Sequence, residues 1–383
     1  MNPRLCALLF IVAACAVAQA FVQTPSKNAL QRFRAEVGLA NHAFGSRSAL
    51  QMKGDSNYPP IVPKDSTVLV VGATGYIGKF VVQECVRRGF KKVIAVTRSE
   101  PQGKEEYFNG ANIKVADVTN PESIKTAFEG EQVDAVISCL ASRSGTKSDS
   151  FLIDYQATLN SLEAARAAKA KHFVLLSAFC VRKPTLQFQL AKLQFEKALR
   201  SADDITHSIV RPTAFFKSVS GQLEVVQAGA PFVYFGDGTM CKCNPIAESD
   251  LAEYMVNCIE EVEKRNKVLN LGGPDEGLTM RQQGEILAEA CGIDNPKFFG
   301  APIVLFDWII GALAWLGQWS AGAEDAAELA RIGKYYAVED MLTEKPEEKY
   351  GKITLRQHYE RIAVEGQEYD PYTTMLAVPK KKD

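Results

Sequence analysis

The sequence has almost no net charge. Its 383 residues include 44 Lys or Arg and 45 Asp or Glu, which leaves a formal charge of −1 at pH 7. Six of the basic residues but only one acid lie in residues 1–53, so the remainder of the chain is mildly acidic. Proteins that bind nucleic acid through its phosphates present a basic surface instead. We therefore expect no nucleic-acid partner.

The cysteine pattern lacks the paired spacing of a zinc site. None of the nine cysteines belongs to a CxxC pair that has a matching partner pair, so we predict no metal site. The close pair Cys241 and Cys243 has the spacing of alternate residues on one strand. Two of the nine, Cys6 and Cys15, fall in the leader described below, and we expect the other seven to be reduced thiols.

No apolar run is both long enough and free enough of charge to span a bilayer comfortably. Residues 302–319 come nearest, but Asp307 interrupts them. A membrane span and a helix buried against a second lobe are the two alternatives, and the charge and the length favour the buried helix.

The first 20 residues have the pattern of a signal peptide. Arg4 precedes an apolar stretch at residues 8–17, and the small-x-small cleavage signal follows at residues 18–20. Residues 21–53 are rich in Arg, Ser and Ala, which is the composition of a transit segment. This tandem resembles the two-part leader of algae with complex plastids. We therefore expect plastid import and a mature chain that begins near Lys53.

Short apolar segments alternate with amphipathic segments between residues 67 and 210. Residues 67–71 are continuously apolar, as in a strand that is buried on both faces. Such alternation predicts an α/β fold of the Rossmann type, a doubly wound parallel sheet with a smaller mixed C-terminal substrate lobe. The expected boundaries are 65–275 for the sheet domain with a lobe segment inserted at about 215–245, 276–365 for the lobe and 366–383 for a tail.

A glycine-rich turn joins the first strand to its helix. Gly72 permits the tight turn, Gly75 lets a pyrophosphate approach the backbone, and Gly78 lets the helix pack closely. The amides at the helix N-terminus then bind the phosphates. Because the turn has a strand before it and a helix after it, the pattern predicts a dinucleotide site. The residues expected to bind the cofactor here are Gly72, Thr74, Gly75, Tyr76, Ile77 and Gly78.

The ends of the next two strands indicate which dinucleotide binds. Arg98 follows the second strand, where an NAD enzyme usually has an acidic residue, and a basic side chain there accommodates a 2′-phosphate. We therefore expect NADPH. Asp117 and Val118 follow the third strand and are placed to hold the adenine edge, although Asp117 has the alternative role of capping the next turn.

A catalytic tyrosine is missing at the expected place. The glycine spacing resembles that of extended and atypical short-chain dehydrogenases, in which a Ser or Thr ends the fifth strand and a Tyr-x-x-x-Lys segment follows. Here Ser177 and Lys192 match, but Phe188 stands where the tyrosine would be. A phenylalanine cannot donate a proton to a carbonyl oxygen. The resemblance therefore leaves Ser177 and Lys192 as catalytic candidates, with Lys192 also placed to hold the nicotinamide ribose.

A longer resemblance covers roughly residues 65–365. The segments that carry it are residues 154–216, 235–238, 241–243, 272–274 and 332–337. In these segments the chain is similar to the plastid, NADPH-using divinyl chlorophyllide 8-vinyl-reductases.

This resemblance implies reduction of a vinyl group that is conjugated with a tetrapyrrole ring, which needs no carbonyl tyrosine. It implies a chlorophyllide-type substrate, whose propionate Lys183, Arg211 or Lys217 could meet. Two alternatives stay open, a non-catalytic nucleotide-binding protein that assists photosystem assembly and an isoflavone-reductase-like enzyme. Peripheral contact with the thylakoid or envelope, the oligomeric state and the proton donor are also left open. Aromatic residues of the second lobe, expected to be mostly core, are Phe215, Phe216, Phe232, Tyr234, Phe235, Phe306, Trp308, Trp315 and Trp319.

Overall fold

A computed structural model describes residues 60–100 and 105–367 of the chain. The expected signal peptide, residues 1–20, and transit segment, residues 21–53, lie outside the described residues, as does the expected tail beyond residue 367.

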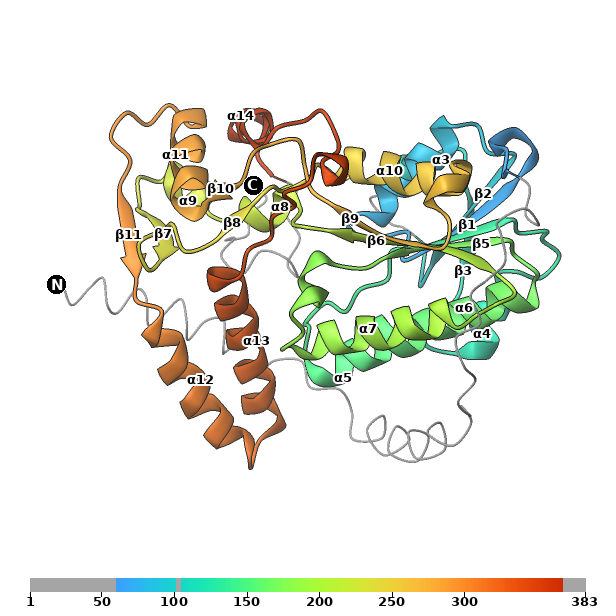
Figure 1. Ribbon diagram of the computed structural model, residues 1–383, viewed down its shortest axis with the longest axis horizontal. Helices are drawn as coiled ribbons and strands as arrows, with labels where there is room; N and C mark the ends of the chain where they lie inside the picture. The colour runs from blue at the N-terminus through green and yellow to red at the C-terminus, as the bar shows by residue number, and fades with distance from the viewer. Residues whose placement is uncertain (1–59, 101–104, 368–383) are drawn as a thin grey trace.

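A sheet of seven parallel strands forms the larger of two bodies (Figure 1). The strand order β3-β2-β1-β4-β5-β6-β9 changes direction between β1 and β4, which confirms the predicted doubly wound topology. Every residue of β1 is buried, because helices cover both faces of the sheet. The strands are β1 (Thr67–Val71), β2 (Lys92–Thr97), β3 (Asn112–Val115), β4 (Ala135–Ser138), β5 (His172–Leu176), β6 (Thr206–Pro212) and β9 (Lys267–Leu271).

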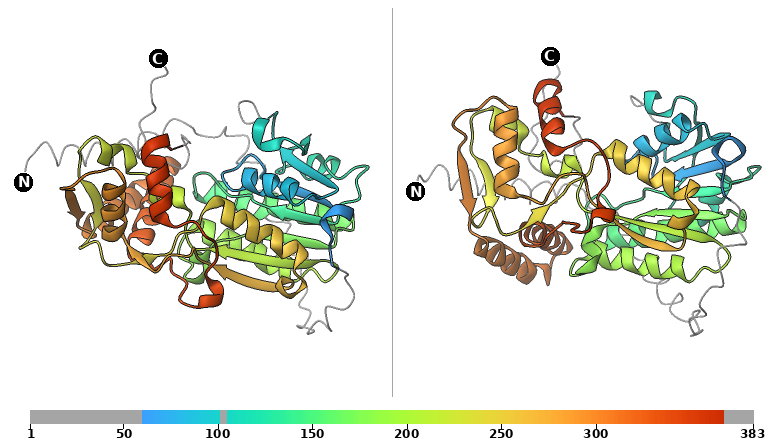
Figure 2. Two further views of the ribbon diagram at one scale, coloured as in Figure 1. Left: turned by 90° about the horizontal axis from the view of Figure 1, so that it is seen from above. Right: turned by 45° about the horizontal axis from the view of Figure 1, so that its top comes forward.

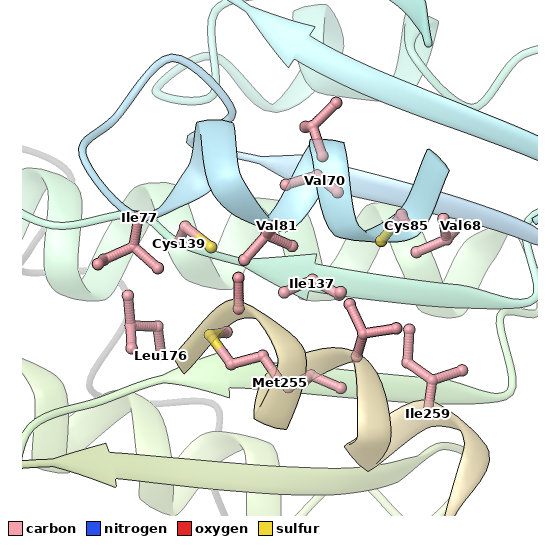
Figure 3. Close-up of a cluster of buried hydrophobic side chains, with 14 of the residues drawn as sticks. Val68, Val70, Ile77, Val81, Cys85, Ile137, Cys139, Leu176, Met255 and Ile259 are labelled. Atoms are coloured by element: carbon pink, nitrogen blue, oxygen red, sulfur yellow. The ribbon is translucent and has the colours of Figure 1, made fainter. Parts of the chain in front are cut away.

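Helices α3 (Gly78–Arg87) and α10 (Glu248–Glu260) pack side by side on one face of this sheet. Figure 3 shows side chains of both helices meeting those of the strands in a continuous apolar core. The other face is covered by α4 (Pro121–Thr126), α6 (Thr158–Ala167) and α7 (Gln187–Arg200).

The alanine-rich residues 155–169 predict a helix, and in the structure that helix begins with a different geometry. Residues Phe151–Ala157 are π-helical, and they continue as α6. The Thr158 hydroxyl donates to the carbonyl of Ile153 at 2.9 Å, which satisfies one acceptor of the widened turn. A π-helical segment often occurs at a functional site. Short helices complete the sheet body and its connections: α5 (Lys147–Ser150), Pro63–Asp65, Glu105–Phe108, Phe179–Arg182, Val262–Lys264 and Pro346–Glu348.

The second, smaller body is built from two separate parts of the chain. The part between β6 and α10 pairs with the part after β9, through β7 with β11 and β8 with β10. The spacing of Thr279 and Gln282 predicts a capping box, and the structure has it at the start of α11. The elements are α8 (Phe216–Val219), α9 (Leu223–Gln227), β7 (Phe232–Phe235), β8 (Lys242–Cys243), β10 (Leu278–Thr279), α11 (Met280–Ala290), β11 (Phe298–Ala301), α12 (Val304–Gly317), α13 (Ala321–Val338) and α14 (Leu355–Glu365).

The two bodies are joined at a junction where segments of the chain pack closely together. Asn244 exchanges two hydrogen bonds with Thr343, at 2.9 Å from its side-chain amide and 3.2 Å to its side-chain carbonyl. A Cβ added to Gly272 would lie 2.3 Å from both of these side chains. A Cβ on Gly273 would lie 1.9 Å from the carbonyl oxygen of Pro245. Three separate segments therefore meet with no room for a further atom.

The helix predicted within residues 302–319 is present as α12, but the prediction that it is buried is wrong. No residue of α12 is buried, and its main packing partner is α13. Figure 1 and the views in Figure 2 place the α12–α13 hairpin at the edge of the molecule. The prediction that the lobe's aromatic residues are mostly core fails for the tryptophans in particular, because Trp308, Trp315 and Trp319 are 76%, 60% and 69% exposed.

Candidate active site

The glycine-rich turn needs two of its glycines for steric reasons. Gly72 has φ of 73°, and a Cβ there would lie 2.8 Å from the backbone of Cys139, at the end of β4. A Cβ on Gly78 would lie 2.1 Å from the carbonyl oxygen of Gly72. The absence of a side chain at Gly78 therefore lets the start of the helix approach the turn. The sequence had suggested a close approach of the helix to the sheet. Gly75 is exposed at the outer side of the turn.

Helix α3 starts at this turn with an N-terminus that has no side-chain cap. Ile77 occupies the N-cap position, and its buried apolar side chain cannot accept a hydrogen bond from the first-turn amides. Thr74 and Tyr76 are partly exposed beside it. An uncapped helix N-terminus next to an exposed glycine fits a phosphate group, which supplies the acceptors that a capping side chain would otherwise provide.

Arg98, Asp117 and Val118 lie at the same edge of the sheet, after β2 and β3. The Arg98 side chain is exposed directly at the end of β2. Asp117 accepts hydrogen bonds from the amide and the hydroxyl of Thr119 at 2.9 and 2.7 Å, so its carboxylate does cap the next turn. Val118 is buried, and its carbonyl accepts a hydrogen bond from Asn160 of α6 at 3.1 Å.

Lys192 is buried on the inward side of α7 and forms an ion pair. Its Nζ lies 2.9 Å from Oδ1 of Asp154, which belongs to the π-helical segment. The side chains are 10% and 1% exposed, so each ion depends on the other for its charge to be tolerated. Lys192 also acts on Cys139 beside the glycine turn. Burial raises the pKa of the Cys139 thiol to about 12, and the Lys192 charge opposes that rise.

Ser177 follows β5 and belongs to a second buried network. This network includes Glu196, which lies one helical turn after Lys192 on α7. The Ser177 hydroxyl donates to Oε1 of Glu196 at 2.6 Å, and the same carboxylate pairs with the guanidinium of Arg211 on β6. Ser177 and Glu196 are 3% and 1% exposed. The hydroxyl hydrogen of Ser177 is therefore directed to Glu196. Ser177 and Lys192 therefore each have a carboxylate partner of their own.

Helix α13 brings the second body to this edge. Its Tyr335 hydroxyl donates to the carbonyl of Cys180 at 2.8 Å, in the short helix that follows β5. Glu328 of α13 accepts a hydrogen bond from the amide of Gln187 at 2.8 Å, at the positive end of α7. Phe188, which replaces the expected tyrosine, is partly buried in the apolar cluster that contains Tyr335.

The three basic residues suggested for a propionate are held in different ways. Arg211 pairs with Glu196, and Lys183 pairs with Glu339. Lys217 is buried, with its Nζ 4.9 Å from the ring centre of Tyr76. Among them, Lys217 lies nearest to the glycine turn in the contacts that the structure records.

Sequence reasoning assigned no role to Asp154 or Glu196. Glu196 lies four residues after Lys192, so helical spacing places both on one face, and this signal was available. No local signal links Asp154 to Lys192, because their contact depends on how the π-helical segment packs against α7.

Comparison with known proteins identifies the family. Residues 72–262 match a family model described as NAD(P)H-binding. Divinyl chlorophyllide a 8-vinyl-reductase of Arabidopsis thaliana is 48% identical over 79% of this chain and 78% of its own. The photosystem II assembly factor Ycf39 of Trieres chinensis is 25% identical over 70% of this chain and 81% of its own.

Solved structures agree on the fold. A quinone oxidoreductase of Escherichia coli, solved with NADPH, aligns with a TM-score of 0.59 and 18% identity, over 77% of this chain and 99% of its own. At that identity the likeness concerns the fold alone. The glycine turn and the uncapped helix fit the NAD(P)H-binding model, and the identity to the plant reductase extends through both bodies. The chain belongs to the divinyl chlorophyllide a 8-vinyl-reductase family.

Proposed function

We propose that the protein reduces the 8-vinyl group of divinyl chlorophyllide a, or of divinyl protochlorophyllide, to an ethyl group with NADPH. The observation that carries this proposal is the 48% identity to a reductase of that name over 79% of the chain. The relative is described as chloroplastic, which supports the expected plastid location. None of the helices in the described part of the chain is long and apolar enough to cross a membrane.

The cofactor residues of the proposal lie along the carboxyl edge of the sheet. The amides at Tyr76 and Gly78 would hold the pyrophosphate, since α3 has no side-chain cap of its own. The Gly75 amide already donates to the carbonyl of Gly72 at 3.0 Å, so Gly75 would contribute space for the phosphate. Arg98 would hold the 2′-phosphate. For Asp117, only the carboxylate oxygen not used by Thr119 is left for the adenine edge.

NADPH supplies a hydride when it is bound, and a proton added at the neighbouring carbon completes the ethyl group. Lys192, fixed by Asp154, would orient the nicotinamide ribose. Phe188 offers no proton, which suits a vinyl group conjugated with a ring better than a carbonyl. Ser177 would position the end of β5 through its hydrogen bond to Glu196, and this role is favoured over proton transfer.

The alternative of a non-catalytic assembly protein is less well supported. The match to the assembly factor is 25%, against 48% for the reductase. The two roles also predict different outcomes in one experiment.

The test is an anaerobic single-turnover assay with NADPH and divinyl chlorophyllide a, read by pigment chromatography. We expect the monovinyl product from the wild type and from Phe188→Tyr. Arg98→Asp should lose the preference for NADPH over NADH, because it removes the basic group that meets the 2′-phosphate. A wild-type protein that binds NADPH but forms no monovinyl product would contradict the proposal and favour the assembly role.

A further inference from the structure

All three tryptophans of the chain lie on or next to one exposed helix. Trp308, Trp315 and Trp319 follow each other at intervals of seven and four residues, which places them along one side of α12 and its C-terminal end. Trp315 and Trp319 contact each other edge to face, with ring centres 4.9 Å apart. The neighbouring apolar side chains Val304, Leu305 and Leu316 are 57%, 43% and 46% exposed.

The charge on α12 is paired with a basic residue of α13. Asp307 is the one charged residue of α12, and its carboxylate forms an ion pair with Lys334 of α13. That pairing offsets the charge of the Asp307 side chain, which is itself 53% exposed. Phe306 points inward and contacts Phe235, with ring centres 4.8 Å apart. The inner side of α12 therefore holds the hairpin together, and the outer side is left to tryptophan and aliphatic groups.

We propose that α12 is an interfacial membrane anchor, which lies flat in the boundary between headgroups and acyl chains of a lipid bilayer. At a rise of 1.5 Å per residue, its 14 residues extend about 21 Å, which is too short for a hydrocarbon core of about 30 Å. An apolar run of 10–14 residues suits an interfacial segment better than a span, and tryptophan is enriched at the boundary between membrane and water.

The chemistry of the outer side favours lipid over a protein partner. Protein interfaces contain about one hydrogen bond per 100–200 Å², and they are enriched in arginine as well as in aromatic residues. Besides the carboxylate of Asp307, which is paired with Lys334, the exposed hydrogen-bonding side chains of α12 and its C-terminal end are the indole N–H groups and Gln318. Indole rings suit a bilayer boundary, because the ring is apolar and its N–H can reach a wet headgroup.

Charge around the hairpin favours an uncharged lipid surface. The turn from α12 into α13 is followed by Glu324 and Asp325, which are acidic. A cluster of basic residues attracts a helix to anionic headgroups. Arg331, further along α13, is already paired with Glu324 and Glu328. Burial of apolar surface would therefore drive the attachment, with little dependence on anionic lipid.

The anchor places the membrane beside the candidate active site. Helix α13 lies between α12 and the sheet body in Figure 1, and its Tyr335 contacts the segment that follows β5. The inference itself rests on α12 alone, so it holds or fails independently of the proposed reductase activity.

Tryptophan fluorescence is the direct test, because every tryptophan of the chain reports on α12. The chain without its leader is titrated with phosphatidylcholine vesicles in the absence of pigment. We expect the emission to shift to shorter wavelength, brominated acyl chains to quench it, and the protein to float with the vesicles. Adding phosphatidylglycerol should change the partition coefficient little.

Two triple variants separate α12 from general surface hydrophobicity. Replacing Trp308, Trp315 and Trp319 by Gln should lower the vesicle partition coefficient by about tenfold or more. The matched control replaces three other exposed apolar residues, Leu190, Val268 and Val364, by Gln and should bind as the wild type does. Unchanged NADPH affinity shows that the sheet body of each variant is intact.

Four outcomes would overturn the proposal. These are no shift and no flotation, flotation retained by the tryptophan variant, flotation only with anionic vesicles, or a fluorescence shift that follows protein concentration without vesicles. The last would assign α12 to a second copy of the chain.

Discussion

Helices α7 and α12 are each 14 residues long, but they place charged and apolar side chains in opposite ways. Helix α7 buries Lys192 and Glu196, which pair with Asp154 of the π-helical segment and with Arg211 of β6. Helix α12 buries nothing and exposes tryptophan. Leucine or alanine at the buried positions of α7, and polar residues on α12, would be the ordinary choices for a stable soluble fold.

The difference shows where the chain departs from the simplest stable sequence. Buried ion pairs contribute little net stability compared with well-packed apolar groups, but they fix the position of a charge. An exposed apolar stripe contributes nothing to the fold and marks a contact with something else. One helix therefore positions charges inside the molecule, and the other presents apolar surface to the outside.

The largest expected effect comes from removing one half of a buried pair on α7. Glu196→Leu leaves Arg211 without its carboxylate, so the free energy of unfolding should fall by roughly 3–5 kcal/mol. The double variant Glu196→Leu with Arg211→Leu should recover most of that loss. Ser177→Ala is the control for the hydroxyl that both variants leave without an acceptor. Chemical denaturation measures the wild type and the three variants, and a double variant as unstable as Glu196→Leu alone would contradict this expectation.

Acid should act mainly on the sheet body. Burial lowers the pKa of His172 to about 3, of His207 to about 4 and of His358 to about 4. A histidine in the unfolded chain has a pKa near 6.5, so below that pH the unfolded chain binds more protons than the folded protein. The free energy of unfolding therefore decreases as the pH is lowered from 6.5, until the pH reaches the folded pKa values. Each histidine contributes roughly 1.4 kcal/mol per pH unit.

His172 and His207 lie on β5 and β6 of the sheet body, and His358 lies on α14 of the other body. Denaturation at pH 7.5, 6.5 and 5.5 should show a flat region followed by a decline. His172→Gln should reduce the slope of that decline. An equal slope in the variant would show that His172 is already protonated in the folded protein or is not shielded from solvent.

A smaller effect is expected from the partner of Lys192. Asp154→Asn keeps the shape of the side chain but removes the charge that holds Lys192 in place. We expect the Kd for NADPH to rise about fivefold to tenfold, which is roughly 1 kcal/mol. The control Asp204→Asn breaks an exposed ion pair with Arg166 and should leave the Kd unchanged. Isothermal titration measures both, and equal affinities would remove Lys192 from the cofactor site.

The smallest effect on stability should come from α12. Replacing its three tryptophans by Gln should change the free energy of unfolding by no more than about 0.5 kcal/mol, because exposed side chains lose little on substitution. Thermal and chemical unfolding both measure this. A large loss of stability would mean that the tryptophans support the fold, and the contrast between α7 and α12 would then be lost.

The sequence predicts well what is local. The strands, the glycine turn and the capping box at Thr279 each depend on a few neighbouring residues, and the structure has all of them. The pairing of Asp154 with Lys192 depends on a π-helical turn that no residue pattern announces. The exposure of Trp308 was missed for another reason. Apolar composition indicates that a segment is unfavourable in water, but it does not indicate whether protein or lipid covers the segment.

The junction at Asn244, Gly272 and Thr343 limits how the molecule can move. Domain closure usually rotates two bodies about a few residues that can absorb a change in backbone torsion. Here the crossing strands leave no space beside Gly272 and Gly273, and two hydrogen bonds join Asn244 to Thr343. A rotation at this point would have to break the bonds and displace the backbone together. Entry of a wide, flat pigment should therefore depend on displacement of the α12–α13 hairpin, with the two bodies kept in register.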